Sequence, residues 1–186
     1  LMHCTGISAG EIRMALRRAR DEALKPAMVF IDAGGPTRIE GGFTTTAAAG
    51  LSFGGALAGA LVPSAGLNPE TGTDTWAEYE VDLPEGGRWN LWIRAQYVDT
   101  NSNSFFLWDP DQPDAPRVLG NRIGTYHEWL WEGPVAVELP AGRSVLRITG
   151  RESRPLESPV LDVIALVHEY AYVPTDGDAR RALAEP

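Results

Sequence analysis

Cysteine is almost absent from this sequence, and Cys4 is the only one in 186 residues. A single thiol excludes an intrachain disulfide and a cluster of thiolate metal ligands. Basic residues are also few, since 16 Lys and Arg stand against 25 Asp and Glu and leave a formal net charge of -9. Without a stripe of Lys and Arg to neutralise phosphates, nucleic acid and anionic membrane surfaces are poor partners.

Common catalytic and metal-binding patterns are missing as well. The sequence has no His-Glu-x-x-His and no phosphate-cradling glycine loop, and its three histidines are scattered. Carboxylates such as Glu128, Glu132, Glu152 and Asp162 are available, but nothing singles out the pair that glycoside hydrolysis needs. We therefore predict that the chain is not an enzyme.

Charge is absent from the whole section between Gly41 and Pro69, and its part from Ala47 to Val62 is mainly Ala, Gly and Leu. This apolar part is shorter than the ~20 residues that a membrane-spanning helix needs and has no basic or aromatic flanks, so no span is predicted. The spacings Gly50 to Gly54 and Gly55 to Gly59 leave two interpretations open, which are closely packed loop and strand, or a flat surface that contacts another subunit.

One helix is predicted, over residues 5–25. Its start at Ser8 to Glu11 fits a capping box, its apolar residues recur on one face, and Pro26 ends it. The other face is basic, which suits either a solvated helix or a docking helix for an acidic partner. We interpret residues 1–26 as an appendage or linker, and the start at Leu1 without a leader pattern as a sign of a piece cut from a longer protein.

The rest of the chain has the pattern of an antiparallel all-β body, predicted over residues 27–174. Apolar and acidic residues alternate from Ala77 to Leu83, and a second alternating run, Arg88 to Ala95, follows the turn. Two Leu-Pro-x-Gly turns, at Leu83 and Leu139, recur between strands. The run from Val160 to Val167 is almost continuously apolar, as in a strand covered on both faces.

Smaller elements complete this prediction. Met28 to Ile31 is expected to form an edge strand, and residues 175–186 a departing tail or linker with a short helical end. Among the tryptophans, Trp89 and Trp131 are predicted in the core, whereas Trp92 either packs under a loop or is exposed.

Taken in order, these segments resemble the carbohydrate-binding modules of the galactose-binding-like jelly-roll class, which includes families 6 and 35. The resemblance covers about Ala77 to Val167, and its matching motifs are Glu78 to Pro84, Trp89 to Ala95, Asn103 to Phe106, Trp129 to Trp131, Leu139 to Gly142, Gly150 to Glu152 and Leu161-Asp162. The opening from Phe30 to Pro36 is more similar to malectin-type sugar-binding domains.

The resemblance implies a two-sheet β-sandwich of jelly-roll topology that binds a polysaccharide or other glycan without catalysis. It also implies a secreted or cell-surface location and attachment to a catalytic domain. Family members often open with a Glu-x-Glu pair that holds a structural calcium ion, but only one carboxylate, Asp32, is kept here. Asp32 and Asp162 are the implied metal ligands, and no other cofactor is expected.

Sugar recognition needs an aromatic face against the C-H side of a pyranose, with polar groups at the ring edge. In the related modules the ligand commonly lies at loops that connect the two sheets, and the segment around Tyr126 resembles such a loop. We predict a platform and edge contacts there, made by Tyr126, His127, Trp129, Arg94, Asn101 and Asn103.

Two further interpretations stay open. Asp109, Asp111 and Asp114 either bind a hard cation or form a solvated acidic turn, and their spacing lacks the glycine and bidentate acid of an EF-hand loop. The whole chain is either a glycan-binding module or a structural β-sandwich subunit that self-associates through the uncharged section. The identity of the sugar depends on loop geometry, which the sequence does not specify.

Overall fold

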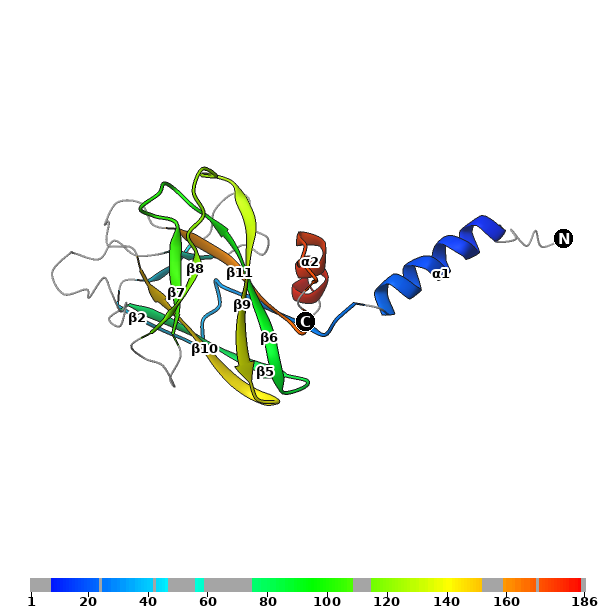
Figure 1. Cartoon of the computed structure of the whole chain (residues 1–186), viewed down its shortest axis with the longest axis horizontal. Helices are drawn as coiled ribbons and strands as arrows, with labels where there is room; N and C mark the ends of the chain where they lie inside the picture. Colours follow the sequence, from blue (N-terminus) through cyan, green and yellow to red (C-terminus); the bar gives the residue numbers. More distant parts are fainter. Residues whose placement is uncertain are drawn as a thin grey trace.

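The computed structural model describes residues 8–23, 25–41, 43–46, 56–58, 75–108, 115–151, 159–169 and 171–184. Within them the chain forms two antiparallel sheets that face each other as a sandwich (Figure 1). The six-stranded sheet consists of β1 (Met28–Asp32), β3 (Thr44–Thr46), β4 (Ala56–Ala58), β6 (Gly87–Gln96), β9 (Trp129–Leu139) and β11 (Val160–Val167). The five-stranded sheet consists of β2 (Arg38–Glu40), β5 (Trp76–Leu83), β7 (Ser104–Trp108), β8 (Arg117–Gly120) and β10 (Gly142–Gly150).

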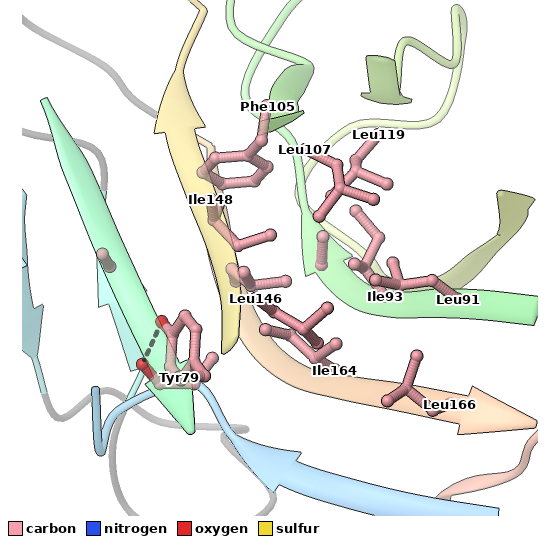
Figure 2. Close-up of a cluster of buried hydrophobic side chains, with 14 of the residues drawn as sticks. Tyr79, Leu91, Ile93, Phe105, Leu107, Leu119, Leu146, Ile148, Ile164 and Leu166 are labelled. Carbon is pink, nitrogen blue, oxygen red and sulfur yellow. Dashed lines mark hydrogen bonds between the residues drawn. The ribbon is translucent and has the colours of Figure 1, made fainter. Parts of the chain in front are cut away.

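The strand order is β3-β4-β11-β6-β9 in the first sheet, with β1 also paired to β11, and β2-β5-β10-β7-β8 in the second. The predicted all-β, two-sheet sandwich is therefore confirmed. Its core lies between the sheets, because alternate residues of each long strand point inward. Figure 2 shows these side chains from both sheets meeting, among them Tyr79, Ile93, Ile148 and Ile164. Trp89 is fully buried there, as predicted.

Both Leu-Pro-x-Gly turns carry the chain from one sheet to the other. The first joins β5 to β6 and the second joins β9 to β10. Because β5 pairs with β10 and β6 pairs with β9, the two turns lie side by side. A Cβ atom on Gly86 would lie 2.9 Å from the Ala141 nitrogen, so this close approach requires glycine. We call this part of the sandwich the turn end.

A second apolar cluster covers the outer face of the six-stranded sheet. Trp92, Ala165 and Val167 are buried there, with Met28, Phe30, Trp131 and Tyr172 packed against them. The strand β11 is thus buried on both faces, as its apolar run predicted. Trp92 lies inside this outer cluster. Trp131 also belongs to it and is half-buried, which corrects its predicted place in the main core.

The C-terminal segment does not depart from the sandwich as the sequence suggested. It forms α2 (Asp176–Ala184), whose first turn is bound to the six-stranded sheet and to the segment before β1. Asp178 accepts hydrogen bonds from Lys25 at 2.7 Å and Tyr172 at 2.8 Å. Thr175 and Asp178 exchange backbone-to-side-chain hydrogen bonds in a capping box, which starts the helix.

The N-terminal helix α1 (Ala9–Ala23) projects away from the sandwich (Figure 1). Its predicted capping box is confirmed, because the Ser8 nitrogen donates to Glu11 at 2.7 Å and the Glu11 nitrogen donates to Ser8 at 3.2 Å. Ile12 and Leu16 of its apolar face are exposed. Neither described helix is long and apolar enough to cross a membrane.

Only short parts of the uncharged section fall within the described residues. They form β3 and β4, which pair with each other, and β4 also pairs with β11. This agrees with the prediction of strand in the section. The four glycines of the two GxxxG spacings lie outside the described residues, as do Asp109, Asp111, Asp114 and Glu152.

Candidate functional site

The candidate site is formed by two loops at the end of the sandwich opposite the turn end, residues 97–103 after β6 and 121–128 before β9. We call this part the loop end. A backbone hydrogen bond joins the two loops, since the His127 nitrogen donates to the carbonyl of Tyr97, the residue after β6, at 2.7 Å. The Gln96 amide also donates to the His127 carbonyl at 3.1 Å. The backbone of His127 is left-handed, with φ of 62°, which turns the chain into β9.

The three predicted aromatic residues differ in accessibility. His127 is exposed and Trp129 is half-buried, so both present ring surface to solvent. Tyr126 is half-buried and packs on the main core, and its hydroxyl oxygen is buried without a hydrogen-bond partner. Of the predicted platform, His127 and Trp129 therefore remain available for stacking, whereas Tyr126 packs on the main core.

Arg94 does not serve as the predicted edge contact. Only 6% of Arg94 is exposed, because β6 directs its side chain onto the outer face of the sheet, beneath α2. Its guanidinium donates to Asp162 at 2.5 Å and to both carboxylate oxygens of Asp176 at 2.9 and 3.1 Å. The guanidinium carbon lies 4.9 Å from the centre of the Trp129 ring. Arg94 thus contacts one face of Trp129 by a cation-π interaction.

The two predicted asparagines also have different roles. Asn103 is 1% exposed, its side-chain nitrogen donates to the Arg122 carbonyl at 3.0 Å, and its own carbonyl accepts from Asn121 at 2.7 Å. It therefore shapes the second loop from inside. Asn101 is exposed at the tip of the first loop, where its backbone nitrogen donates to the Asp99 side chain at 2.7 Å.

Several polar groups at the loop end were not predicted from the sequence. Tyr97 donates its hydroxyl to Glu132, which also lies 3.5 Å from Arg122. Burial and this hydrogen bond raise the pKa of Tyr97 far above its usual range. Nothing local in the sequence marks this pair, because Tyr97 and Glu132 are 35 residues apart.

Three buried polar atoms at the loop end lack a hydrogen-bond partner. They are the Ser102 hydroxyl, the Asn103 side-chain oxygen and the Tyr126 hydroxyl. Buried polar atoms are almost always hydrogen-bonded, so a group of unpaired ones indicates a place that water or a polar ligand completes. The loop end therefore combines accessible rings with unused hydrogen-bonding capacity.

The implied calcium ligands do not fit the ion. Asp162 is fully buried in its ion pair with Arg94, and Asp32 accepts a hydrogen bond from the Gly34 nitrogen at 2.8 Å. Burial, reinforced by the nearby Asp162, raises the pKa of Asp32. Calcium takes six to eight oxygen ligands, and the described residues contain no group of three or more His, Cys, Asp or Glu that could hold a metal. The cation beside Asp162 is instead the guanidinium of Arg94.

One short motif has the form Gly-x-Ser-x-Gly, at Gly50 to Gly54, outside the described residues. In hydrolases this motif joins a strand to a helix. Here the next described residues form a strand, β4, which pairs with β3 and β11. The context therefore differs from that of a nucleophile elbow.

Solved structures share this architecture. The family 35 carbohydrate-binding module from Clostridium thermocellum superimposes with a TM-score of 0.55 at 14% identity, over 75% of this chain and 98% of that one. The fold is that of the family 35 modules. The CBM35 from Cellvibrio japonicus Abf62 matches with a TM-score of 0.53 at 15% identity, over 80% of this chain and 99% of that one.

The family 35 fold is also found inside larger enzymes. The GH26-CBM35 β-(1,4)-mannanase of Podospora anserina matches with a TM-score of 0.56 at 14% identity, and the match covers 81% of this chain but only 29% of the mannanase. No family model matches the sequence, and no curated protein matches it. At such low identity the similarity concerns the fold, and function has to be argued from side chains.

Proposed function

We propose that this chain is a non-catalytic carbohydrate-binding module that belongs to a larger secreted or cell-surface protein and binds a glycan at its loop end. The observation that carries the proposal is the combination, in the same two loops and the start of β9, of accessible His127 and Trp129 with three unpaired buried polar atoms. The family 35 fold supports it, since the solved modules match over almost their whole length.

In this proposal a pyranose packs on the open face of Trp129, whose opposite face is supported by Arg94. Aromatic rings suit this contact because they bury C-H groups without losing hydrogen bonds. His127 lies two residues before Trp129 and contacts the sugar edge, and the exposed amide of Asn101 reaches a hydroxyl from the first loop. Ser102, Asn103 and Tyr126 complete hydrogen bonds with hydroxyls or with ligand-ordered water.

Catalysis is not part of the proposal. Glycoside hydrolysis needs two carboxyl groups placed about 5 to 10 Å apart across the scissile bond. At the loop end Glu132 is committed to Tyr97 and Arg122, and Glu128 is exposed. Glu132 is therefore not a free carboxyl group of the kind that such a pair requires.

The test is calorimetry and affinity electrophoresis against galactose, β-1,3-galactan and β-1,4-mannan. These sugars are chosen because matched structures include an exo-β-1,3-galactanase with galactose and a β-(1,4)-mannanase. We expect binding to at least one glycan, and Trp129→Ala to weaken it by about tenfold or more, which corresponds to losing roughly 1.4 kcal/mol of stacking.

Trp108→Ala is the matched control. Trp108 is also half-buried, and it also stacks with an arginine, Arg147, at 4.5 Å, but it belongs to the five-stranded sheet. Its substitution should leave the affinity unchanged. Equal losses in both variants, or no binding to a wider panel of plant and algal polysaccharides, would count against a loop-end site.

A further inference from the structure

The turn end contains an open hollow of about 650 Å³ that has no part in the proposed loop-end site. Its lining comes from the start of β6 and the segment after β11, and consists of Gly86, Gly87, Arg88, Asn90, His168 and Glu169. The strand β6 separates it from the loop end, because Gly87 pairs with Leu139 at one end and Gln96 with Trp129 at the other. At about 3.3 Å per residue, the two ends lie about 30 Å apart along this strand.

His168 forms one wall of the hollow, and its ring is held in place by Trp89 and Glu85. The imidazole of His168 packs on the fully buried Trp89, with ring centroids 4.9 Å apart. Its Nδ1 lies 3.3 Å from a carboxylate oxygen of Glu85, and the Glu85 carbonyl accepts from the Trp89 indole at 3.3 Å. In the neutral ring this arrangement favours the proton on Nδ1 and leaves Nε2 as an acceptor. Nε2 faces Gly87, where a Cβ atom would lie 3.7 Å away.

Asn90 supplies a buried and incompletely satisfied polar group. Only 3% of this residue is exposed, and its side-chain nitrogen donates to the Val167 carbonyl at 3.4 Å. Its side-chain oxygen has no partner. Asn90 lines the hollow, and a buried acceptor without a partner is costly unless a ligand or water donates to it.

The charges around the hollow select the class of ligand. Arg88 is exposed and contributes one positive charge, while Glu85 and Glu169 contribute two negative charges. The net negative balance disfavours an anion, and the guanidinium of Arg88 disfavours a metal ion. A neutral compound with several hydroxyls matches both sets of groups. Its O-H groups donate to Asn90 and His168, and its oxygens accept from Arg88.

We propose that the turn end is a second binding site, for a neutral polyhydroxylated ligand the size of one or two sugar units. Gly86 and Gly87 keep the wall free of side chains, and Gly87 has φ of 126°, which side-chain-bearing residues rarely adopt. The hollow is large enough for a sugar ring and its first hydration shell. This site does not depend on glycan binding at the loop end, and binding at both ends would make one chain bivalent.

The test is a titration of the full chain with D-galactose, D-mannose and D-glucose, followed by two-dimensional NMR of amide and indole N-H groups. At least one sugar should cause saturable shifts at Arg88, Trp89, Asn90 and Glu169, with a midpoint of roughly 1 to 10 mM, as is usual for a small neutral ligand in an open site. Signals at Asn101 and His127 report the loop end in the same spectra, so failure at either end is seen separately.

Two variants examine the assignment of the residues. His168→Ala removes an acceptor and one wall, and Arg88→Ala removes an exposed donor without touching the core. Each should raise the turn-end midpoint by about tenfold, while Arg17→Ala, which removes an exposed arginine on α1, should not. If His168→Ala unfolds the chain, the midpoint measured for Arg88→Ala still tests the turn-end site.

Three results would overturn the proposal. The first is the absence of saturable turn-end shifts with every sugar up to roughly 100 mM, a concentration far above the expected midpoint. The second is shifts that persist unchanged in both variants. The third is saturation by inorganic phosphate or by Zn²⁺ alone, which would assign the hollow to an anion or a metal ion.

Discussion

At the scale of single residues, Arg94 connects the six-stranded sheet, α2 and the loop end. A buried guanidinium is stable only when its charge and donors are satisfied, and Arg94 meets this condition through Asp162 and Asp176. The same side chain supports Trp129 at the loop end. A residue that sequence reasoning assigned to the ligand therefore acts on the site indirectly, through the ring it holds.

Arg94→Met should be strongly destabilising, because it removes the guanidinium that pairs with the fully buried Asp162. We expect a loss of about 3 to 5 kcal/mol in the free energy of unfolding, measured by chemical denaturation. Arg143→Ala is the control, since Arg143 pairs with Glu80 in an exposed position and should cost at most about 1 kcal/mol. Similar losses in the two variants would show that Asp162 does not depend on Arg94.

A substitution at His127 separates the backbone strain of this residue from its proposed contact with the glycan. Its left-handed backbone is unfavourable for a residue with a side chain, whereas glycine adopts it freely. We expect His127→Gly to keep the stability within about 1 kcal/mol of the parent or to raise it, while glycan affinity falls. Thermal unfolding and calorimetry on the same variant measure both effects, and an unchanged affinity would remove His127 from the site.

At the scale of elements, α2 is bound to the sandwich mainly by two aspartates in its first turn. Burial alone would raise the pKa of Asp178, but hydrogen bonds from Lys25, Thr175 and Tyr172 outweigh burial and hold it far below the ordinary value. The pKa of Asp176 is also lowered, because hydrogen bonds from Arg94 and Trp131 outweigh its burial. The negative charge of both groups therefore favours the docked helix.

A pH dependence follows from the direction of these shifts. A carboxyl group whose folded pKa is lowered contributes stability that is complete above its unfolded pKa of about 3.9 and is lost as pH falls toward the folded value. As pH falls below about 4, the attachment of α2 should weaken progressively, and hydrogen exchange of its amides should accelerate before that of β11. Asp32 acts in the opposite direction because burial raises its pKa.

Asp178→Asn should imitate this detachment at neutral pH. The amide keeps the shape but loses the charge that accepts from Lys25, so hydrogen exchange in α2 should be fast at pH 7 and change little on acidification. Asp82→Asn, at an exposed carboxylate of β5, is the control. If α2 of Asp178→Asn stayed protected at pH 7, its attachment would have to rest on the hydrogen bonds of Asp176 or on the apolar contacts of the outer cluster.

At the scale of the whole molecule, the sandwich and α1 are separable. The helix projects into solvent with its apolar residues exposed, whereas Lys25 beyond its end takes part in holding α2 (Figure 1). The alternative function, a structural subunit, would use such a helix or the uncharged section for contacts between copies.

Removal of residues 1–23, which keeps Lys25, should leave the thermal midpoint within about 2 °C of the parent, because the side chains of α1 that the structure describes are exposed. Glycan binding should also stay unchanged. Sedimentation velocity at several concentrations measures association in both forms. Concentration-dependent association that the truncation abolishes would favour the structural-subunit hypothesis, and a large fall in the midpoint would show that α1 packs on the sandwich.

The sequence by itself determined the local features of this protein. Alternation from Ala77 to Leu83, the capping box at Ser8 and the two-sided burial of β11 could all be predicted, because each depends on the period of side chains along one segment. The order of these segments was also enough to indicate a family 35 type of sandwich. The loop end as a binding site stays a prediction, and the structure shows that Arg94 and Asn103, assigned to it from the sequence, are buried.

Only the tertiary structure decided which distant residues meet. The partners of Arg94 lie 68 and 82 residues away, so no local pattern could distinguish a buried ion pair from a sugar contact. In the same way, Trp131 belongs to the outer cluster because α2 returns to cover that face. Side-chain periodicity is a property of one strand, whereas the cover of a strand's second face and the partner of a buried charge depend on how the whole chain folds back.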